Sequence, residues 1–451
     1  MLFGSLTRSR GWIAGLIVLS PLSAVWAQSA AATIGSPNRT TQQTAAATTT
    51  TTAPAVATPA TTAPADPLMD QIDKAIEVNS HRYLKANYNS PWQIFHGILA
   101  YRQGFTLQVG DKRMPAIDWI ATADARYHNL PWIVTTPHGA KFHPYSGVPK
   151  AFEGHPSQSL ALLSESHLPT DFKFKAQGRD VTIGDMLQNS MMEVNTREET
   201  TWVLWALINY MPVDKQWVSQ SGESWSIERL VQLEVAAHTP TRPCGGNHNL
   251  FVLCRARDKY LKTGLPLRGV WLEADQKIKM YAEYARTMQN PDGSFSSNFY
   301  KGPGHTTQMD ARFNTTGHTL EFLSIALPEK RLKEQWVRNA ANILSWELIQ
   351  TKQASPDPGP LYHSLNALMN YRNRVRPPAA PVEVAQTPAV APTTPGTVKT
   401  ETPTVAPALL APGVVNIAKP AAVDPTAPRL PGTDAPETTG PVSALEPANR
   451  R

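Results

Sequence analysis

Short apolar segments recur six times along the middle of the chain, and each follows a polar corner. Their apolar side chains are spread around the helical circumference rather than along one stripe, which predicts helices that are buried on most sides. In chain order they are SPWQIFHGILAY (90–101), FEGHPSQSLALL (152–163), REETTWVLWALINY (197–210), CGGNHNLFVLCRA (244–256), NTTGHTLEFLSIAL (314–327) and GPLYHSLNALMNY (359–371).

Amphipathic segments lie between the apolar ones. In residues 271–288, apolar positions such as Trp271, Ala274 and Ile278 step by three and four, the spacing of a helix that buries one side. We therefore expect an outer set of helices that packs on the buried set and faces water. The other segments of this kind are 183–194, 226–237 and 332–348, with weaker patterns in 67–87 and 115–126.

Short β-ribbons are expected before three of the outer helices. Residues 104–119 and 171–186 each hold two strand-like runs around a Gly turn, then a helix start, and residues 221–230 are a shortened copy. The repeating unit is inner helix, ribbon or turn, outer helix and polar corner. The predicted fold is an all-α (α/α)6 toroid with short β-ribbon insertions. An open solenoid would need polar capping repeats, which the sequence does not show.

Composition changes at both ends of the chain. Residues 1–27 contain two arginines, a short apolar run and small residues, the pattern of a secretory signal peptide. Residues 28–66 are a Thr/Ala/Pro-rich linker, and residues 377–451 are a Pro/Ala-rich segment that we expect to be a disordered tail. The toroid domain is placed at 67–376, in a protein exported to the periplasm or secreted.

Charge and cysteine content narrow the possible partners. The net charge of +6 over 451 residues is modest, and no basic stripe with interleaved aromatics is present, so no nucleic-acid partner is expected. After signal cleavage no segment is long and apolar enough to span a membrane, so an integral membrane protein is not expected. Cys244 could pair with Cys254, but the second lies two helical turns further on, and both bonded and free states stay open.

The repeat resembles the α/α-toroid superfamily that includes terpenoid cyclases, prenyltransferase subunits, thioester domains and several polysaccharide lyases. MQNPDGSF (288–295) is similar to the Q-x3-G-x-W/F repeat of squalene-cyclase-type proteins. More specifically, EGHPSQSLALLSES with the GG-x-H and TGH-x-LEFL corners resembles an uncharacterised family of exported toroid proteins from planctomycete-type bacteria. This resemblance covers most of the core and implies a fold and a compartment, but no activity.

Chemical features of those relatives are missing here. The D-x-D-D box of squalene cyclases is absent, and no metal-ligand spacing matches the zinc site of protein prenyltransferases. Thioester domains open an inner helix with C-G-E-Q, whereas this chain has Cys244-Gly245-Gly246-Asn247 at that place. Asn is one methylene shorter than the Gln that closes the thioester ring. We therefore expect no cofactor, and interpret Cys244-Gly245-Gly246 as the tight turn that begins a helix.

The polar corners hold the candidate site. Parallel inner helices would gather their N-termini at one mouth, where unpaired N–H groups and helix dipoles favour polar or anionic ligands. Five of the six corners carry a histidine and the sixth carries paired carboxylates, although the chain has only 12 histidines. The catalytic candidates are His155, His248, His318 and Glu153; the substrate-binding candidates are His96, Glu198, Glu199, Asn247, Arg312, Tyr362 and His363. The Tyr/His pair and the Arg are included by analogy with polysaccharide lyases.

Alternative roles for these corner residues stay open. Histidines and paired carboxylates suit acid–base catalysis near neutral pH, but the same residues can cap helices or bond neighbouring loops. Histidines with a glutamate can also hold zinc, but nothing resembles H-E-x-x-H, and no metal is expected. A long aromatic loop, 128–155, is expected to pack as a ribbon over the mouth, and a second loop spans 299–318.

Three functions remain after this reasoning. The first is an exported toroid whose central cleft binds and processes a polar or anionic polymer, with a glycan favoured. The second is a non-catalytic binding or scaffold protein of the cell envelope. The third is a terpenoid- or lipid-handling toroid, which is disfavoured because the corners carry His, Glu and Asn rather than aromatic side chains. Whether the chain is an enzyme stays open.

Overall fold

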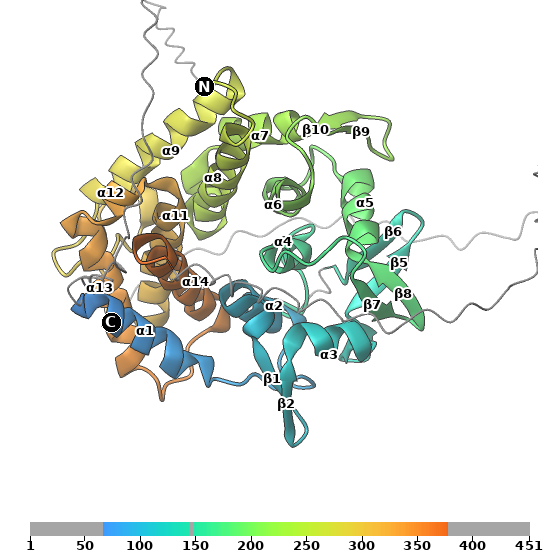
Figure 1. The fold of residues 1–451 in the computed structure, drawn as a ribbon, viewed down its shortest axis with the longest axis horizontal. Coiled ribbons are helices and arrows are strands. Elements are labelled where there is room, and N and C mark those ends of the chain that lie inside the picture. Colours follow the sequence, from blue (N-terminus) through green and yellow to red (C-terminus); the bar gives the residue numbers. More distant parts are fainter. Residues whose placement is uncertain (1–65, 145–147, 378–451) are drawn as a thin grey trace, which may run out of the picture. The chain divides into compact units, whose positions relative to one another are not determined.

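The computed structural model describes residues 66–144 and 148–377 (Figure 1). The predicted signal peptide, almost all of the predicted linker and the predicted tail from residue 378 onward lie outside the described residues. The described part is mostly helical and carries small two-stranded antiparallel sheets, as the sequence pattern predicts. None of its helices is long and apolar enough to cross a bilayer.

Six largely buried helices form the inner set. Each contacts the next in chain order, and the last returns to contact the first, so the contacts form a closed cycle. In Figure 1 these helices lie inside the remaining ones. The segments predicted to be buried are therefore helical. The inner helices are α2 (Pro91–Tyr101), α4 (Gln158–Ser164), α6 (Thr201–Tyr210), α8 (Asn247–Leu261), α11 (His318–Ala326) and α14 (Pro358–Val375).

Six further helices pack outside the inner set. Each contacts an inner helix through one apolar face; α9, for example, buries Trp271, Ala274 and Ile278. This arrangement confirms the predicted amphipathic helices, the two weaker ones included. The outer helices are α1 (Pro67–Ser80), α3 (Ala116–Thr122), α5 (Ile183–Glu193), α7 (Ile227–Ala236), α9 (Val270–Thr287) and α13 (Gln335–Gln350).

Short helical turns connect the two sets. Part of the predicted loop 299–318 is helical: it contains a four-residue helix and a π-helical turn that runs directly into α11. The short helices are α10 (Met309–Arg312) and α12 (Glu329–Leu332), the π-helical turn is η5 (Phe313–Gly317), and the 3-10 turns are η1 (Arg102–Gly104), η2 (Thr239–Thr241), η3 (Pro243–Gly246) and η4 (Phe299–Lys301).

The sheets are ribbons between helices. Two of them confirm the ribbons predicted in 104–119 and 171–186. A third lies before α7 and begins earlier than the predicted 221–230, and the others lie in the aromatic segment 128–155 or at its start. The pairs are β1 (Thr106–Val109) with β2 (Lys112–Pro115), β3 (Arg126–Tyr127) with β4 (Leu130–Pro131), β5 (Ile133–Thr136) with β6 (Gly139–Phe142), β7 (Lys173–Ala176) with β8 (Arg179–Thr182), and β9 (Gln216–Val218) with β10 (Ser224–Ser226).

The segment that resembles the squalene-cyclase repeat has a structural role. The side-chain amide of Gln289, just after α9, donates to the carbonyl oxygens of Gly293 at 2.9 Å and Trp336 at 2.8 Å. Gly293 has φ of +91°, and a Cβ there would meet the Asn339 carbonyl oxygen at 2.7 Å. The motif therefore fastens the end of α9 to α13 on the outer side of the fold.

Candidate functional site

Two adjoining cavities lie where the inner helices begin. Each has a volume of about 380 Å³, and His155 lines both. The first, called here the carboxylate cavity, includes Glu153, Glu193, Glu198 and Glu199 in its lining. The second, called here the histidine cavity, is lined from the N-terminal segments of α2, α4, α8, α11 and α14. The structure thus brings together most of the corner residues proposed from sequence.

Four of the five histidines that line the histidine cavity contact one another through T-shaped or tilted ring pairs. The ring centroids of His318 and His363 are 4.0 Å apart, and His248 lies 4.9 Å from His318 and 5.0 Å from His363. His96 follows at 5.3 Å from His363. These four residues, which we call the histidine cluster, come from four different inner helices, so only the closed arrangement of helices brings them together.

Three of these rings are oriented by a bond from Nδ1. His96 donates to the carbonyl oxygen of Trp92 at 2.6 Å, and His318 donates to that of Asn314 at 2.6 Å, each four residues earlier. Nδ1 of His363 lies 2.8 Å from a carboxyl oxygen of Glu321, whose pKa burial raises to about 7. Because a carbonyl oxygen only accepts, Nδ1 of His96 and of His318 carries the proton and Nε2 keeps its lone pair.

Burial keeps the histidine cluster uncharged. Desolvation lowers the pKa of His318 and of His363 to about 3. Desolvation, together with neighbouring histidines, lowers the pKa of His96 and His248 well below the ordinary histidine value. At neutral pH all four are therefore neutral imidazoles, which offer lone pairs rather than acidic protons.

Several nitrogens of the cluster have no hydrogen-bond partner within the described part of the chain. These are both ring nitrogens of His248 and the Nε2 atoms of His318 and His363, all fully buried. A buried polar atom without a partner costs about 1–3 kcal/mol, and such atoms are rare in folded proteins. Their concentration at one point indicates a place that is shaped for a ligand.

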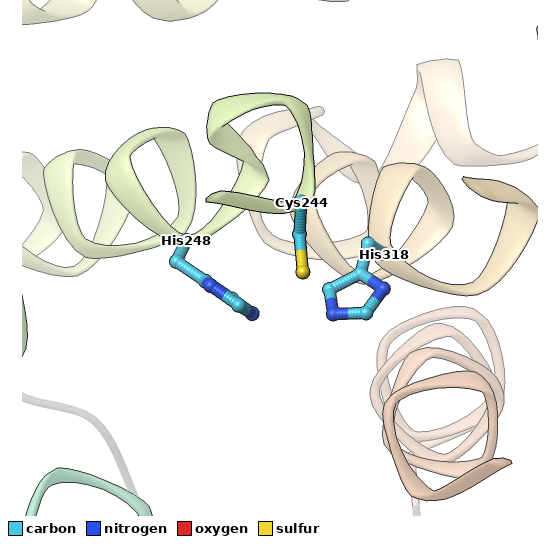
Figure 2. Close-up of side chains that lie close together, drawn as sticks. All are labelled: Cys244, His248 and His318. Carbon is cyan, nitrogen blue, oxygen red and sulfur yellow. The ribbon is translucent and has the colours of Figure 1, made fainter. Parts of the chain in front are cut away.

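Cys244 completes this group. Its sulfur lies between the rings of His248 and His318 (Figure 2), and one ligand atom from each of the three residues falls within 4.8 Å of the others. Both cysteines are free thiols, and burial raises the pKa of Cys244 to about 12. The sequence indicated a turn at this position, which the structure confirms, but did not indicate that the thiol would face the histidines.

The turn that presents Cys244 is tightly constrained. Cys244 has φ of +50°, an uncommon conformation for a residue with a side chain. Gly245 and Gly246 follow with φ of +64° and +80°. A Cβ at Gly246 would meet the Thr239 carbonyl oxygen at 2.3 Å, so glycine is required at that position.

The carboxylate cavity contains acidic groups whose pKa values move in opposite directions. Burial raises the pKa of Glu153 to about 8, although the Ser159 N–H donates to its carboxylate at 2.8 Å. For Glu199, burial also raises the pKa, but the hydrogen bond and charge of His155 outweigh it and the net pKa is lowered. Nδ1 of His155 lies 2.7 Å from Oε2 of Glu199, and its ring stacks on Trp202.

Three residues proposed as substrate-binding lie outside both cavities. Arg312 pairs with Glu347 at 2.6 Å and with Asp292 at 3.0 Å, which fastens α10 to α13. The Asn247 side chain accepts from the Tyr300 hydroxyl at 2.7 Å and donates to the Cys244 carbonyl at 3.0 Å. Tyr362 packs among aromatic rings and lines neither cavity.

The sequence reasoning missed Glu321 as well as the thiol of Cys244. Glu321 is fully buried on α11, three residues after His318, and also accepts from the Asn366 amide at 2.6 Å. An acidic residue inside the apolar run LEFLSIAL is a signal that could have identified it, because an unpartnered carboxylate is rarely buried. Its partner, His363, is 42 residues further along the chain.

Comparisons with known proteins assign no function to this site. Comparison with protein-family models, with curated proteins and with solved structures gave no match. The resemblance to exported toroid proteins therefore stays a prediction from the sequence, and the function has to be argued from the geometry of the two cavities.

Proposed function

We propose that the described domain is an (α/α)6 toroid whose mouth binds and hydrolyses a polar polymer, with a neutral glycan as the favoured substrate class. The closed cycle of contacts through the six inner helices, with a second helix packed outside each, supports the toroid. Export through the predicted signal peptide belongs to the same proposal. It would place the chain among the polysaccharides of the cell envelope.

The opposite pKa shifts of Glu153 and Glu199 support hydrolysis most directly. A glycosidase needs one carboxylic acid that is protonated and one carboxylate that is ionised, on either side of the scissile bond. At neutral pH Glu153 holds its proton, with a pKa of about 8, and Glu199 is ionised beside His155. Both line the same cavity. Glu153 is therefore the proposed acid, and Glu199 with His155 the proposed base.

The charge of the lining favours a neutral polymer over an anionic one. Besides Glu153 and Glu199, the cavity lining contains Glu193 and Glu198. Lys141 also lines the cavity, and it is paired with Glu193 at 2.8 Å. An acidic lining repels uronates and sulfated sugars. The four carboxyl groups in the lining also disfavour a terpenoid or lipid, which would need a pocket without them.

The experiment is a hydrolysis assay on labelled neutral and acidic oligosaccharides. We expect the wild-type chain to cleave a neutral member of the panel. Glu153→Gln and Glu199→Gln should each lower kcat by about 100-fold or more while binding persists, since removing a positioned acid or base costs about that much. Glu223→Gln is the control, because this carboxylate pairs with Arg229 at 3.4 Å and lines neither cavity.

Two results would contradict the proposal. If no oligosaccharide is cleaved but one is bound at the mouth, the chain is the non-catalytic binding or scaffold protein. If cleavage occurs and both variants keep wild-type kcat, the catalytic pair lies elsewhere. Preference for acidic oligosaccharides would overturn the substrate class alone.

A further inference from the structure

The histidine cavity holds a group of side chains that hydrolysis does not use. Ligand atoms of Cys244, His248 and His318 lie within 4.8 Å of one another, at the starts of α8 and α11 (Figure 2). Atoms bound to one tetrahedral zinc ion lie about 3.3–3.6 Å apart, from bond lengths of about 2.0–2.3 Å. A small inward movement of the side chains would therefore bring these atoms to coordination distance.

We propose that Cys244, His248 and His318 bind a transition-metal ion of the zinc type. This inference departs from the absence of metal expected from the sequence. It goes beyond the proposed hydrolysis, because it concerns other residues in the other cavity, and either proposal can hold without the other.

The hydrogen-bond pattern supports metal ligands rather than ordinary packing. Metal-binding histidines nearly always use their second ring nitrogen to donate to a carbonyl or carboxylate, which fixes the ring and leaves a lone pair for the metal. His318 does this through the Asn314 carbonyl. Its Nε2 and both nitrogens of His248 are buried and have no partner among the described residues. A histidine that only filled the core would gain nothing from this arrangement.

The backbone also presents these ligands in a specific way. Cys244 is held at φ of +50°, and such strain in a non-glycine residue concentrates at functional sites. The π-helical turn η5 (Phe313–Gly317) leads directly into His318, and π-turns inside helices are frequent at functional sites. Two independent local irregularities thus flank the same three side chains.

The donor set indicates the class of metal. One thiolate and two imidazoles favour Zn²⁺ or copper, whereas Mg²⁺ and Ca²⁺ require oxygen ligands. Three protein ligands leave a fourth position, as in catalytic zinc sites. The ring centroid of His363 lies 4.0 Å from that of His318 and 5.0 Å from that of His248. Its Nδ1 contacts Glu321, and its Nε2 has no partner in the part of the chain that the structure describes.

The experiment is a Co²⁺ titration of the metal-free full-length chain, followed by absorption spectroscopy. Wild type should show a sulfur-to-cobalt charge-transfer band that saturates at one cobalt per chain and disappears when Zn²⁺ is added. Cys244→Ser should abolish the band, and His318→Gln should weaken cobalt binding at least about tenfold. Cys254→Ser is the matched control and should keep the band, because that buried thiol lies inside α8 away from the cavity.

If wild type shows no band, the proposed metal site is wrong. The same conclusion follows if the band persists in Cys244→Ser or is lost in folded Cys254→Ser. Because a variant could fail to fold, the second measurement uses wild type alone. X-ray absorption of the zinc-loaded chain should show one sulfur at about 2.3 Å and nitrogens at about 2.0 Å. A shell without sulfur would overturn the proposal. Neither readout needs a saccharide, so failure here is distinct from failure of the proposed hydrolysis.

Discussion

Two groups of polar residues lie toward opposite ends of the inner helices, and they differ in charge and in which of their polar atoms have partners. The histidine cluster lies near the N-termini. At the other end Glu165 caps α4 and is contacted by residues from other inner helices or their ends. This Glu165 cluster consists of Glu165, Arg102, Arg255, Trp205 and Asn209.

In the Glu165 cluster the carboxylate is fully engaged. One oxygen accepts from the Trp205 indole at 2.8 Å and from Asn209 at 3.2 Å, and the other pairs with Arg255 and, at 3.4 Å, with Arg102. Burial alone would raise the pKa of Glu165, but the two arginines and the hydrogen bonds lower it to about 2. This carboxylate is charged because the two arginines and the hydrogen-bond donors around it stabilise its ionised form.

In the histidine cluster the rings are neutral, and three of the four carry a buried nitrogen with no hydrogen-bond partner among the described residues. In the Glu165 cluster the buried atoms without a described partner are two arginine N–H groups, at Nη1 of Arg102 and Nε of Arg255. The two clusters are connected, since Asn366 donates to Glu321 at 2.6 Å and accepts from Arg102 at 2.9 Å. The comparison indicates that one cluster holds the helices together, whereas the other keeps lone pairs available at some cost in stability.

The largest expected effect follows from removing the central carboxylate. Glu165→Ala leaves Arg102 and Arg255 without their buried counter-charge, which should lower the free energy of unfolding by about 3–5 kcal/mol. Urea unfolding measures the change. Glu193→Ala is the control: it removes a half-exposed partner of Lys141 and should cost less than about 1 kcal/mol. Equal losses in the two variants would show that the Glu165 cluster does not hold the helices together.

A second prediction concerns the pH dependence of Glu153. The pKa of this group is about 8 in the folded chain and 4.5 as its ordinary value, so the folded state binds more protons between these values. Stability is therefore lost as pH rises from about 4.5 to about 8. Glu153→Gln cannot ionise, so its stability relative to wild type should increase by about 3–5 kcal/mol between pH 4 and pH 9.

The pH dependence of stability expected from Glu165 has the opposite sign. Its lowered pKa means that its stabilising effect is present above about pH 4.5 and is lost as pH falls toward about 2. Urea unfolding of wild type and Glu153→Gln is measured from about pH 2 to pH 9. The effect of Glu153 is absent from the variant, whereas the effect of Glu165 is present in both proteins. A stability difference that stays constant from pH 4 to pH 9 would show that Glu153 does not titrate abnormally.

The sequence predicted the helices and ribbons well because burial periodicity is a local property. Residues 201–208 are buried on every side, and their uniform apolarity shows this directly. Whether a residue belongs to a site is not a local property of the sequence. Glu153, His155 and Glu199 meet because the segments before α4 and α6 lie side by side, which needs the three-dimensional arrangement of the helices.

The same reason explains which candidate residues were misplaced. Arg312 was included by analogy with polysaccharide lyases, but Glu347, 35 residues away, pairs with it outside both cavities. Cys244 was interpreted only as part of a turn, because a search for a local motif such as H-E-x-x-H cannot detect that side chains at positions 244, 248 and 318 lie close together. Distant partners decide whether a polar residue is structural or available to a ligand.

The smallest expected effect tests this comparison most closely. The ring of His248 lies 4.7 Å from that of Trp202, and its two buried nitrogens have no partner among the described residues. His248→Phe replaces it by an apolar ring of similar size. In the metal-free chain it should raise the free energy of unfolding by about 1 kcal/mol, because the desolvation cost of those nitrogens is removed. His363→Phe is the matched change within the cluster. It leaves Glu321 without its Nδ1 partner and should lower that free energy by about 1–3 kcal/mol. If His248→Phe destabilises as much as His363→Phe, then the nitrogens of His248 have partners in solution, as the carboxylate of Glu165 does.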